Sequence, residues 1–76
     1  MEYRLDPTVL DHAKAASGAR SDEQLGQMFL YKTGETVRKW RRGATNPDVV
    51  SLMRLKNITG RPLDTMMIHE SATAAA

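Results

Sequence analysis

Cysteine is absent from this chain, and its 76 residues include one Trp, two Tyr and one Phe. Without cysteine the chain has no disulfide, no thiolate zinc site and no cysteine nucleophile, which fits a reducing compartment. It also lacks the run of roughly 18 apolar residues that a membrane span needs. The N-terminus has neither the basic start nor the apolar stretch of a signal peptide. These absences predict a cytoplasmic protein that is stabilised by packing alone.

The length leaves room for one small domain, which excludes a multi-domain enzyme. Hydrophobic residues make up 41% of the chain and charged residues 26%, which is a globular composition and not a disordered one. We expect the domain to span residues 1–70. The small residues of the last segment, 71–76, have nothing to pack against and predict a disordered tail.

The formal net charge is only +2, but the charges are unevenly distributed. Between Lys32 and Lys56 there are seven basic residues and two acidic ones, a local charge of +5, so the remaining residues sum to −3. A basic end on an otherwise mildly acidic body is typical of a surface that binds a polyanion.

Five helix signals follow one another and no segment reads as a strand, so the sequence predicts an all-α fold, a compact five-helix bundle. The expected helices cover residues 7–17, 22–30, 35–42, 47–59 and 62–69. Asp6-Pro7 and Asn46-Pro47 each supply a cap and a proline for a first helical turn. Ser21 and Gln24 form a capping box. Three glycines are placed to end helices: Gly18, Gly43 and Gly60.

The core is expected where apolar residues repeat at helical spacing. The fourth helix is the most apolar, which predicts that it lies at the centre of the core. We expect Met28 and Phe29 of the second helix to be buried. Five side chains are expected to anchor the core: Leu25, Val37, Trp40, Leu52 and Leu55. Trp40 could instead stack against single-stranded nucleic acid, but a lone Trp three residues from Val37 is more typical of a core position.

The third helix is short and strongly basic. Val37 and Trp40 lie on one of its faces, so residues 35, 38, 39 and 42 point elsewhere. Its four cations lie within five positions and repel one another in an isolated helix. A duplex phosphate backbone would remove that penalty through counterion release.

The segment from residue 25 to residue 47 resembles the helix-turn-helix of the XRE/Cro family of phage repressors and bacterial regulators. The usual run in that family is Leu-Ala, a turn, Thr-Ile/Val-x-x-Trp-x-x-Gly and a later Pro. Leu25-Gly26 stands for Leu-Ala, and Thr36-Val37 stands for Thr-Ile. Three further residues occupy their expected places: Trp40, Gly43 and Pro47. The resemblance covers about residues 21–67 and implies a lambda-repressor-like fold.

Three features depart from the family pattern. Leu25 and Val37 are twelve steps apart where the family commonly has eleven, so we expect the turn to be one residue longer. The family often begins its second helix with a glutamine that contacts phosphate. The nearest residue here is Asp22, which cannot donate a hydrogen bond. Tyr31 is near the place of the small residue that is usual in the turn.

The resemblance implies that the third helix enters the major groove of DNA with its N-terminus first. Four side chains would then read base edges: Glu35, Arg38, Lys39 and Arg42. Five residues would contact phosphate: Arg20, Lys32, Thr33, Gly34 and Asn46. The Arg38 guanidinium matches guanine O6 and N7, and the Glu35 carboxylate could accept from a cytosine amino group. Arg41 lies nearer the core and is expected only to snorkel.

The sequence thus predicts a sequence-specific double-stranded DNA-binding transcriptional regulator, similar to a temperate-phage Cro or repressor that occludes a promoter. It would be cytoplasmic, and nucleoid-associated when bound to DNA. No catalytic arrangement, cofactor motif or small-molecule site is recognised, and His12 and His69 lack metal-ligand spacing. A homodimer would form through the C-terminal helix. The alternative is a protein-interaction module, antitoxin-like or adaptor-like, for which Met66 and Met67 could supply the partner surface.

Overall fold

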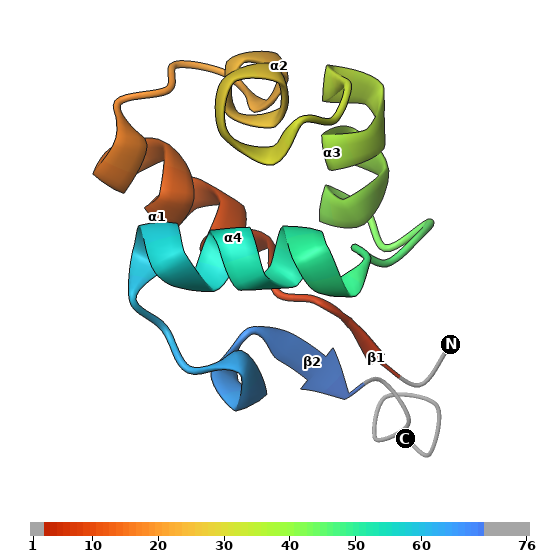
Figure 1. Cartoon of the computed structure of the whole chain (residues 1–76). Helices are drawn as coiled ribbons and strands as arrows, with labels where there is room; N and C mark the ends of the chain where they lie inside the picture. Colours follow the sequence, from red (N-terminus) through yellow and green to blue (C-terminus); the bar gives the residue numbers. More distant parts are fainter. Residues whose placement is uncertain (1–2, 70–76) are drawn as a thin grey trace.

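The computed structural model describes residues 3–69, and this part of the chain is mostly helical (Figure 1). In chain order the elements are β1 (Tyr3–Leu5), α1 (Pro7–Ser17), α2 (Asp22–Leu25), η1 (Gly26–Leu30), α3 (Gly34–Arg41), α4 (Val49–Thr59), η2 (Leu63–Thr65) and β2 (Met67–His69). η1 is a π-helical turn and η2 is a 3-10 turn. The expected tail, residues 71–76, lies outside the described residues.

The first helix forms where its capping residues predict it. The Asp6 side chain accepts a hydrogen bond from the Thr8 backbone N–H at 2.9 Å, and Pro7 occupies the first turn. Gly18 adopts a left-handed conformation with a φ of 82° and donates its N–H to the Lys14 carbonyl oxygen. These two ends confirm the expected range of 7–17.

The second helical segment does not stay α-helical. After α2, residues 26–30 widen into a π-helical turn that ends at Tyr31, whose φ is 56°. In an α-helix Leu25 and Leu30 would point about 140° apart, yet both are fully buried. The wider turn brings both leucines to the core and leaves Met28 62% exposed, so the predicted burial of Met28 was wrong.

The α3 helix is capped at both ends. Thr33 Oγ1 accepts from the Thr36 backbone N–H at 3.2 Å. At the other end, the Gly43 N–H donates to the Trp40 carbonyl and the Ala44 N–H to the Lys39 carbonyl, which is the Schellman pattern of a helix that ends in a left-handed glycine. Thr33 is thus the N-cap of α3, and the expected stop at Gly43 is confirmed.

The start of α4 differs from the sequence-based prediction. Its N-cap is Asp48, and Asp48 Oδ1 accepts from Ser51 Oγ at 2.6 Å. The predicted cap at Asn46 was wrong, because Asn46 Nδ2 donates to the Tyr3 carbonyl oxygen at 2.8 Å and ties this loop to β1. Pro47 is buried in the loop before the helix.

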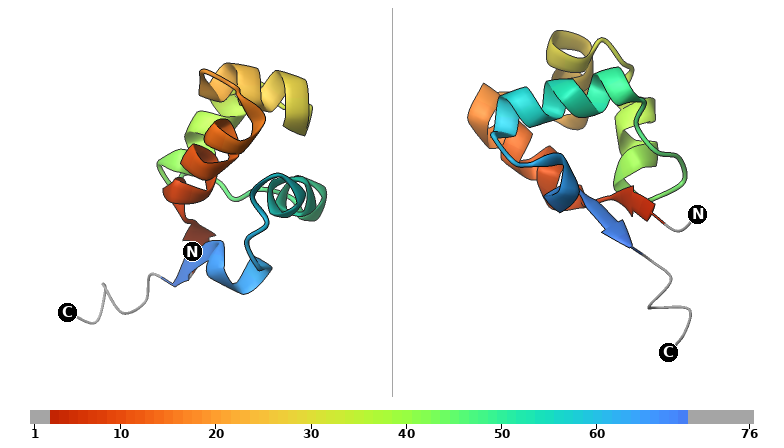
Figure 2. Two further views of the ribbon diagram at one scale, coloured as in Figure 1. Left: turned by 90° about the vertical axis from the view of Figure 1, so that its left-hand side faces the viewer. Right: turned by 60° about the horizontal axis from the view of Figure 1, so that its bottom comes forward.

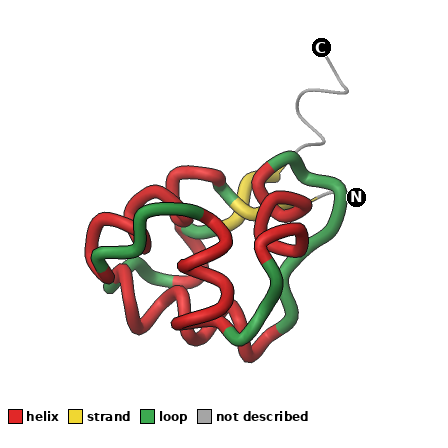
Figure 3. The backbone as a smooth tube through the Cα atoms, turned by 90° about the horizontal axis from the view of Figure 1, so that it is seen from above, coloured by secondary structure: helices red, strands yellow, loops and turns green. Residues whose placement is uncertain are grey.

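The expected fifth helix is absent from the described chain. Residues 63–65 form only a 3-10 turn, and β2 then pairs antiparallel with β1, Leu5 opposite Met67 and Tyr3 opposite His69. A short helix has a costly nucleus, whereas pairing gives backbone groups of residues 3–5 and 67–69 hydrogen-bond partners. Figure 3 shows the two strands at one edge of an otherwise helical body. The five-helix bundle and the absence of strands are therefore corrected.

The core lies between α1, the α2–η1 segment, α3 and one side of α4. Its ten buried hydrophobic residues are Leu5, Val9, Leu10, Ala13, Leu25, Leu30, Val37, Trp40, Leu55 and Met66. Four of the five predicted anchors are among them, and Leu52 is only partly buried against the cluster. α1 contributes three of the ten residues, so α1 rather than α4 is the centre of the core.

The outer side of α4 is exposed, contrary to prediction. Val49 is 73% exposed, Val50 53% and Met53 41%. In the left view of Figure 2, α4 is seen nearly end-on at the margin of the molecule. One side of the helix packs on α1, and no other described element covers the opposite side, which is why three apolar residues remain in contact with solvent.

Candidate nucleic-acid interface

Four exposed side chains form one continuous surface on α3, which we call the α3 face: Glu35, Arg38, Lys39 and Arg42. At about 100° per residue these positions fall within an arc of about 100°. Val37 and Trp40 lie on the opposite side of the helix and are buried. The core thus fixes the helix from one side and presents three cations and one carboxylate to solvent on the other.

Glu35 lies between two of the arginines of the α3 face. Its Oε2 is 3.6 Å from Arg38 Nη2, and its Oε1 is 3.5 Å from Arg42 Nη2. All three side chains are more than half exposed, so each pair is weak in water. Lys39 forms no ion pair with another residue of the described chain. The face therefore keeps a net positive charge.

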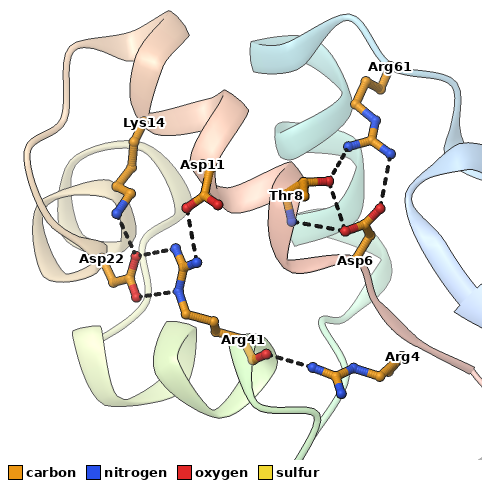
Figure 4. A network of polar contacts seen from close by, with 8 residues as sticks. All are labelled: Arg4, Asp6, Thr8, Asp11, Lys14, Asp22, Arg41 and Arg61. Atoms are coloured by element: carbon orange, nitrogen blue, oxygen red, sulfur yellow. Dashed lines mark hydrogen bonds and ion pairs between the residues drawn. The ribbon is translucent and has the colours of Figure 1, made fainter.

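Arg41 does not belong to this face. Its Nε donates to Asp22 Oδ2 at 2.9 Å and its Nη2 to Asp22 Oδ1 at 2.8 Å, while its Nη1 donates to Asp11 Oδ1 at 3.0 Å. Figure 4 shows the Arg41 guanidinium between these two carboxylates, which come from α2 and α1. Arg41 thus does more than snorkel along the surface. It links α3 to two other helices.

Two further contacts complete this polar network. Lys14 Nζ lies 3.4 Å from Asp22 Oδ1, and Arg4 Nη2 donates to the Arg41 carbonyl oxygen at 2.7 Å. The hydrogen bonds from Arg41 hold the pKa of the Asp22 carboxyl below its usual value, although burial opposes this. Asp22 is consequently ionised at neutral pH, and its charge is balanced inside the molecule.

Two glycines allow the α2–η1 segment and α3 to approach closely. A Cβ on Gly34 would lie 2.8 Å from Glu23 Cβ, and a Cβ on Gly26 would lie 2.6 Å from the Lys32 carbonyl oxygen. Both distances are too short for a real side chain. The absence of a Cβ at these two positions therefore sets how α3 is seated against the preceding helix.

The predicted phosphate contacts do not share one environment. Lys32 is partly exposed, and its Nζ lies 3.7 Å from Asp48 Oδ1. Thr33 is exposed at the start of α3, but its hydroxyl caps the helix. Gly34 is buried against Glu23 and does not lie on the α3 face. The structure thus leaves Lys32 and Thr33 beside the N-terminus of α3.

The other two predicted phosphate contacts lie apart from that end. Asn46 follows α3 in the loop to α4, where its amide donates to β1. Arg20 precedes α2 and is exposed, and its guanidinium forms no ion pair with another residue among 3–69. The Gln24 side chain accepts from the Arg20 backbone N–H at 2.8 Å. The reciprocal bond of the predicted capping box, to the Ser21 N–H, is therefore replaced by one to Arg20.

Sequence reasoning missed how η1 is joined to α4. The Arg54 guanidinium lies 4.6 Å from the centre of the Tyr31 ring, and its Nη1 donates to the Leu30 carbonyl oxygen at 3.4 Å. Arg54 thus satisfies the end of the π-helical turn. Arg54 and Tyr31 are 23 positions apart in the sequence, so no local pattern predicts the contact.

Arg61 makes a similar long-range link near the chain ends. Its Nη1 donates to Thr8 Oγ1 at 3.0 Å, and its Nη2 lies 3.4 Å from Asp6 Oδ2 (Figure 4). The same guanidinium donates to the Thr65 carbonyl oxygen. These bonds fix η2 against the start of α1, away from the α3 face.

Within residues 3–69, no group of three His, Asp or Glu side chains is arranged to hold a metal ion. The helices in that range are also too short or too polar to cross a bilayer. Comparisons with protein-family models, curated proteins and solved structures give no match for this chain.

Proposed function

We propose that this protein is a sequence-specific duplex DNA-binding transcriptional regulator in which α2–η1 and α3 form a helix-turn-helix. The observation that carries the proposal is the arrangement of α3. Its inner side is held by Val37, Trp40 and the Arg41–Asp22 pair, while the α3 face presents Arg38, Lys39 and Arg42 outward. A rigidly seated helix with an outward cationic side fits a major groove, which admits one α-helix.

The base contacts follow from the chemistry of the α3 face. Arg38 lies in the middle of α3, one turn after Glu35, and its guanidinium can donate to both acceptors of a guanine. Lys39 shares this exposed side, and Arg42 at the far end can reach base or phosphate. Glu35 can accept from a cytosine amino group.

Sequence-independent affinity would come from cations outside the α3 face. Lys32 and Arg20 carry the charges best placed for this role, since both flank the α2–η1 segment and both are accessible. Thr33 adds a partly engaged hydroxyl at the α3 N-terminus. Asn46 is left out of this proposal because its amide already donates to the Tyr3 carbonyl oxygen.

The departures from the XRE/Cro pattern acquire physical explanations. The additional residue between Leu25 and Val37 can be absorbed by the π-helical turn of η1. Gly26 stands where the family has alanine, at a place where a Cβ would meet the Lys32 carbonyl oxygen. Asp22 pairs with Arg41 and therefore takes a structural role in place of a phosphate contact. With these departures explained, we propose that the chain belongs to that family and acts as a repressor that occludes a promoter.

Binding to a partner protein is the second candidate function, and the exposed side of α4 favours it. Val49, Val50 and Met53 expose adjoining apolar surface on one helix side, and clustered apolar exposure marks interaction sites. The predicted partner surface at Met66 and Met67 is disfavoured, because Met66 is fully buried and Met67 is partly buried. The predicted homodimer contact through a C-terminal helix is also disfavoured, because η2 and β2 stand in place of that helix.

The test of the proposed function is selection from a random duplex pool at about 150 mM salt, followed by affinity against salt concentration for the enriched sequence. Enrichment of one motif supports the proposal. An inverted repeat with centres about one helical turn apart would indicate a dimer on DNA, and a single half-site a monomer. If no sequence is enriched and binding vanishes as salt rises, the α3 face is only a polyanion patch and the proposal fails.

A further inference from the structure

The Glu35 carboxylate is shared between two arginines of the α3 face. Each carboxylate oxygen approaches a different guanidinium, Oε2 that of Arg38 at 3.6 Å and Oε1 that of Arg42 at 3.5 Å. The three side chains are 52% to 56% exposed. Pairs this exposed contribute little to folding and exchange readily with other partners. Glu35 is therefore positioned to act on ligand binding more than on stability.

A phosphate that approaches Arg38 or Arg42 has to compete with this carboxylate. If the phosphate displaces the carboxylate, Glu35 loses its arginine partners and faces the negative backbone of the duplex. The repulsion between the two negative groups opposes binding. The opposition is the same for every sequence, because every duplex carries the same phosphates.

A base edge that donates a hydrogen bond to Glu35 can remove this repulsion, but only at DNA sites that carry such a base. In the major groove the cytosine amino group is a hydrogen-bond donor that a carboxylate accepts from, whereas thymine presents an acceptor at the same place. A duplex with a cytosine opposite Glu35 satisfies the carboxylate and releases both arginines for guanine or phosphate. Thymine and guanine present acceptors there and leave the carboxylate unsatisfied, while adenine carries its amino donor beside the N7 acceptor, which repels a carboxylate.

We propose that Glu35 is the specificity-determining residue of the α3 face: it suppresses binding to general duplex DNA and permits binding where a cytosine amino group replaces its two arginine partners. This inference rests on the proposed function. It adds that specificity comes largely from a repulsive group, since discrimination needs a penalty against wrong partners as well as contacts to the right one.

A purely structural role for Glu35 predicts a different outcome. The residue lies in the first turn of α3, where a carboxylate favourably faces the helix dipole. Loss of that interaction would lower the melting temperature and weaken binding to all duplexes alike. Glu35→Asp keeps the charge but shortens the reach to the arginines, and should retain the helix-dipole contribution while losing part of the discrimination.

The experiment uses the full chain and two duplexes of equal length, the selected sequence and a scrambled one. Glu35→Gln should tighten binding to the scrambled duplex about three- to tenfold. The slope of log affinity against log salt concentration should become steeper by about one released counterion. Replacing the relevant cytosine pair by a thymine pair should weaken binding of the wild type but not of Glu35→Gln. The matched control is Asp64→Asn, an exposed acid in η2 without an ion pair to another residue of the described chain.

Three results would overturn the inference. If Glu35→Gln and Asp64→Asn change affinity for both duplexes equally, Glu35 acts only through net charge. If Glu35→Gln weakens both duplexes and lowers the melting temperature, its role is structural. If the wild type enriches no sequence, the proposed function fails and the inference fails with it, whereas the first two results leave the proposed function intact.

Discussion

Arg41 and Asp22 are nineteen residues apart in sequence, yet the guanidinium donates to both carboxylate oxygens, at 2.9 Å from Nε and 2.8 Å from Nη2. The pair joins the end of α3 to the start of α2 on the inner side of the two helices. Because this arginine is used internally, the outward charge of α3 comes from its neighbours. The same pair fixes the direction in which the α3 face points.

Acid should weaken the fold through this pair. The folded-state pKa of Asp22 is lowered by the hydrogen bonds from Arg41, so its contribution is present above the unfolded pKa and is lost as pH falls through the folded pKa. Urea unfolding of Asp22→Asn should show a loss of about 1–3 kcal/mol near neutral pH. The difference from wild type should shrink as pH falls below the usual pKa of an aspartate carboxyl and through the lowered pKa of Asp22. A difference that stays constant with pH would contradict the ion pair.

Gly34→Ala should destabilise the domain. An alanine within a helix is normally better than glycine by about 0.5–1 kcal/mol, but here the added Cβ would lie 2.8 Å from Glu23 Cβ and 2.9 Å from Glu23 Cα. Since backbone has to move, we expect a net loss of about 1–3 kcal/mol, measured by chemical denaturation. The sign is the test, because a stabilised variant would show that α2 and α3 are not in close contact at this point.

The two sides of α4 should respond differently to truncation. Leu55 is fully buried, so Leu55→Ala should cost about 2–5 kcal/mol. Met53 is 41% exposed, and Met53→Ala on the same helix should stay within about 0.5 kcal/mol of wild type. Thermal melts of the two variants measure both effects. Equal losses would mean that the outer side of α4 is covered in solution.

Trp40 should report folding and not DNA contact. It is the only tryptophan and is 3% exposed, so its fluorescence should shift strongly to longer wavelength on unfolding and little on adding duplex. Trp40→Ala should cost about 3–5 kcal/mol as a large-to-small core change. A well-folded Trp40→Ala variant, or strong quenching by single-stranded DNA, would indicate a stacking role instead.

Arg38 and Lys32 should contribute to DNA binding in different ways. Arg38→Ala should weaken the selected duplex by about 1–3 kcal/mol and relax preference at one base, because a base contact is lost. Lys32→Ala should weaken all duplexes alike and reduce the salt dependence by about one counterion. Titrations of each variant against the selected and scrambled duplexes distinguish the two effects. If both variants bind every duplex like wild type, the α3 face is not the DNA contact.

Most helix ends could be predicted from sequence because caps are local, and the start of α4 is the exception. Asp6 and Thr33 bond to backbone N–H groups two and three residues away, and Gly18, Gly43 and Gly60 adopt the left-handed conformation that ends a helix. The exposed positions of the α3 face followed from helical spacing alone. Their assignment to DNA stays a prediction.

The interior of the second helical segment could not be predicted in the same way. The usual helical period places Met28 near Leu25, but the π-helical turn brings Leu30 inward instead. That turn is held by the seating of α3 and by Arg54 at its end. Gly26 within the segment permits the close approach, but the partners that hold the turn, α3 and Arg54, lie outside the segment.

By itself the sequence determined where α1, α3 and α4 end. It also determined which side of α3 is apolar and where positive charge accumulates. Each of these features depends on residues within a few positions of one another. Only the tertiary structure decided that residues 67–69 form a strand with residues 3–5, that α4 leaves its outer side exposed, and that Arg41 is used internally. These outcomes depend on partners that are tens of residues away. The free energy of such pairings is set by the whole packed domain and is not visible in any local pattern.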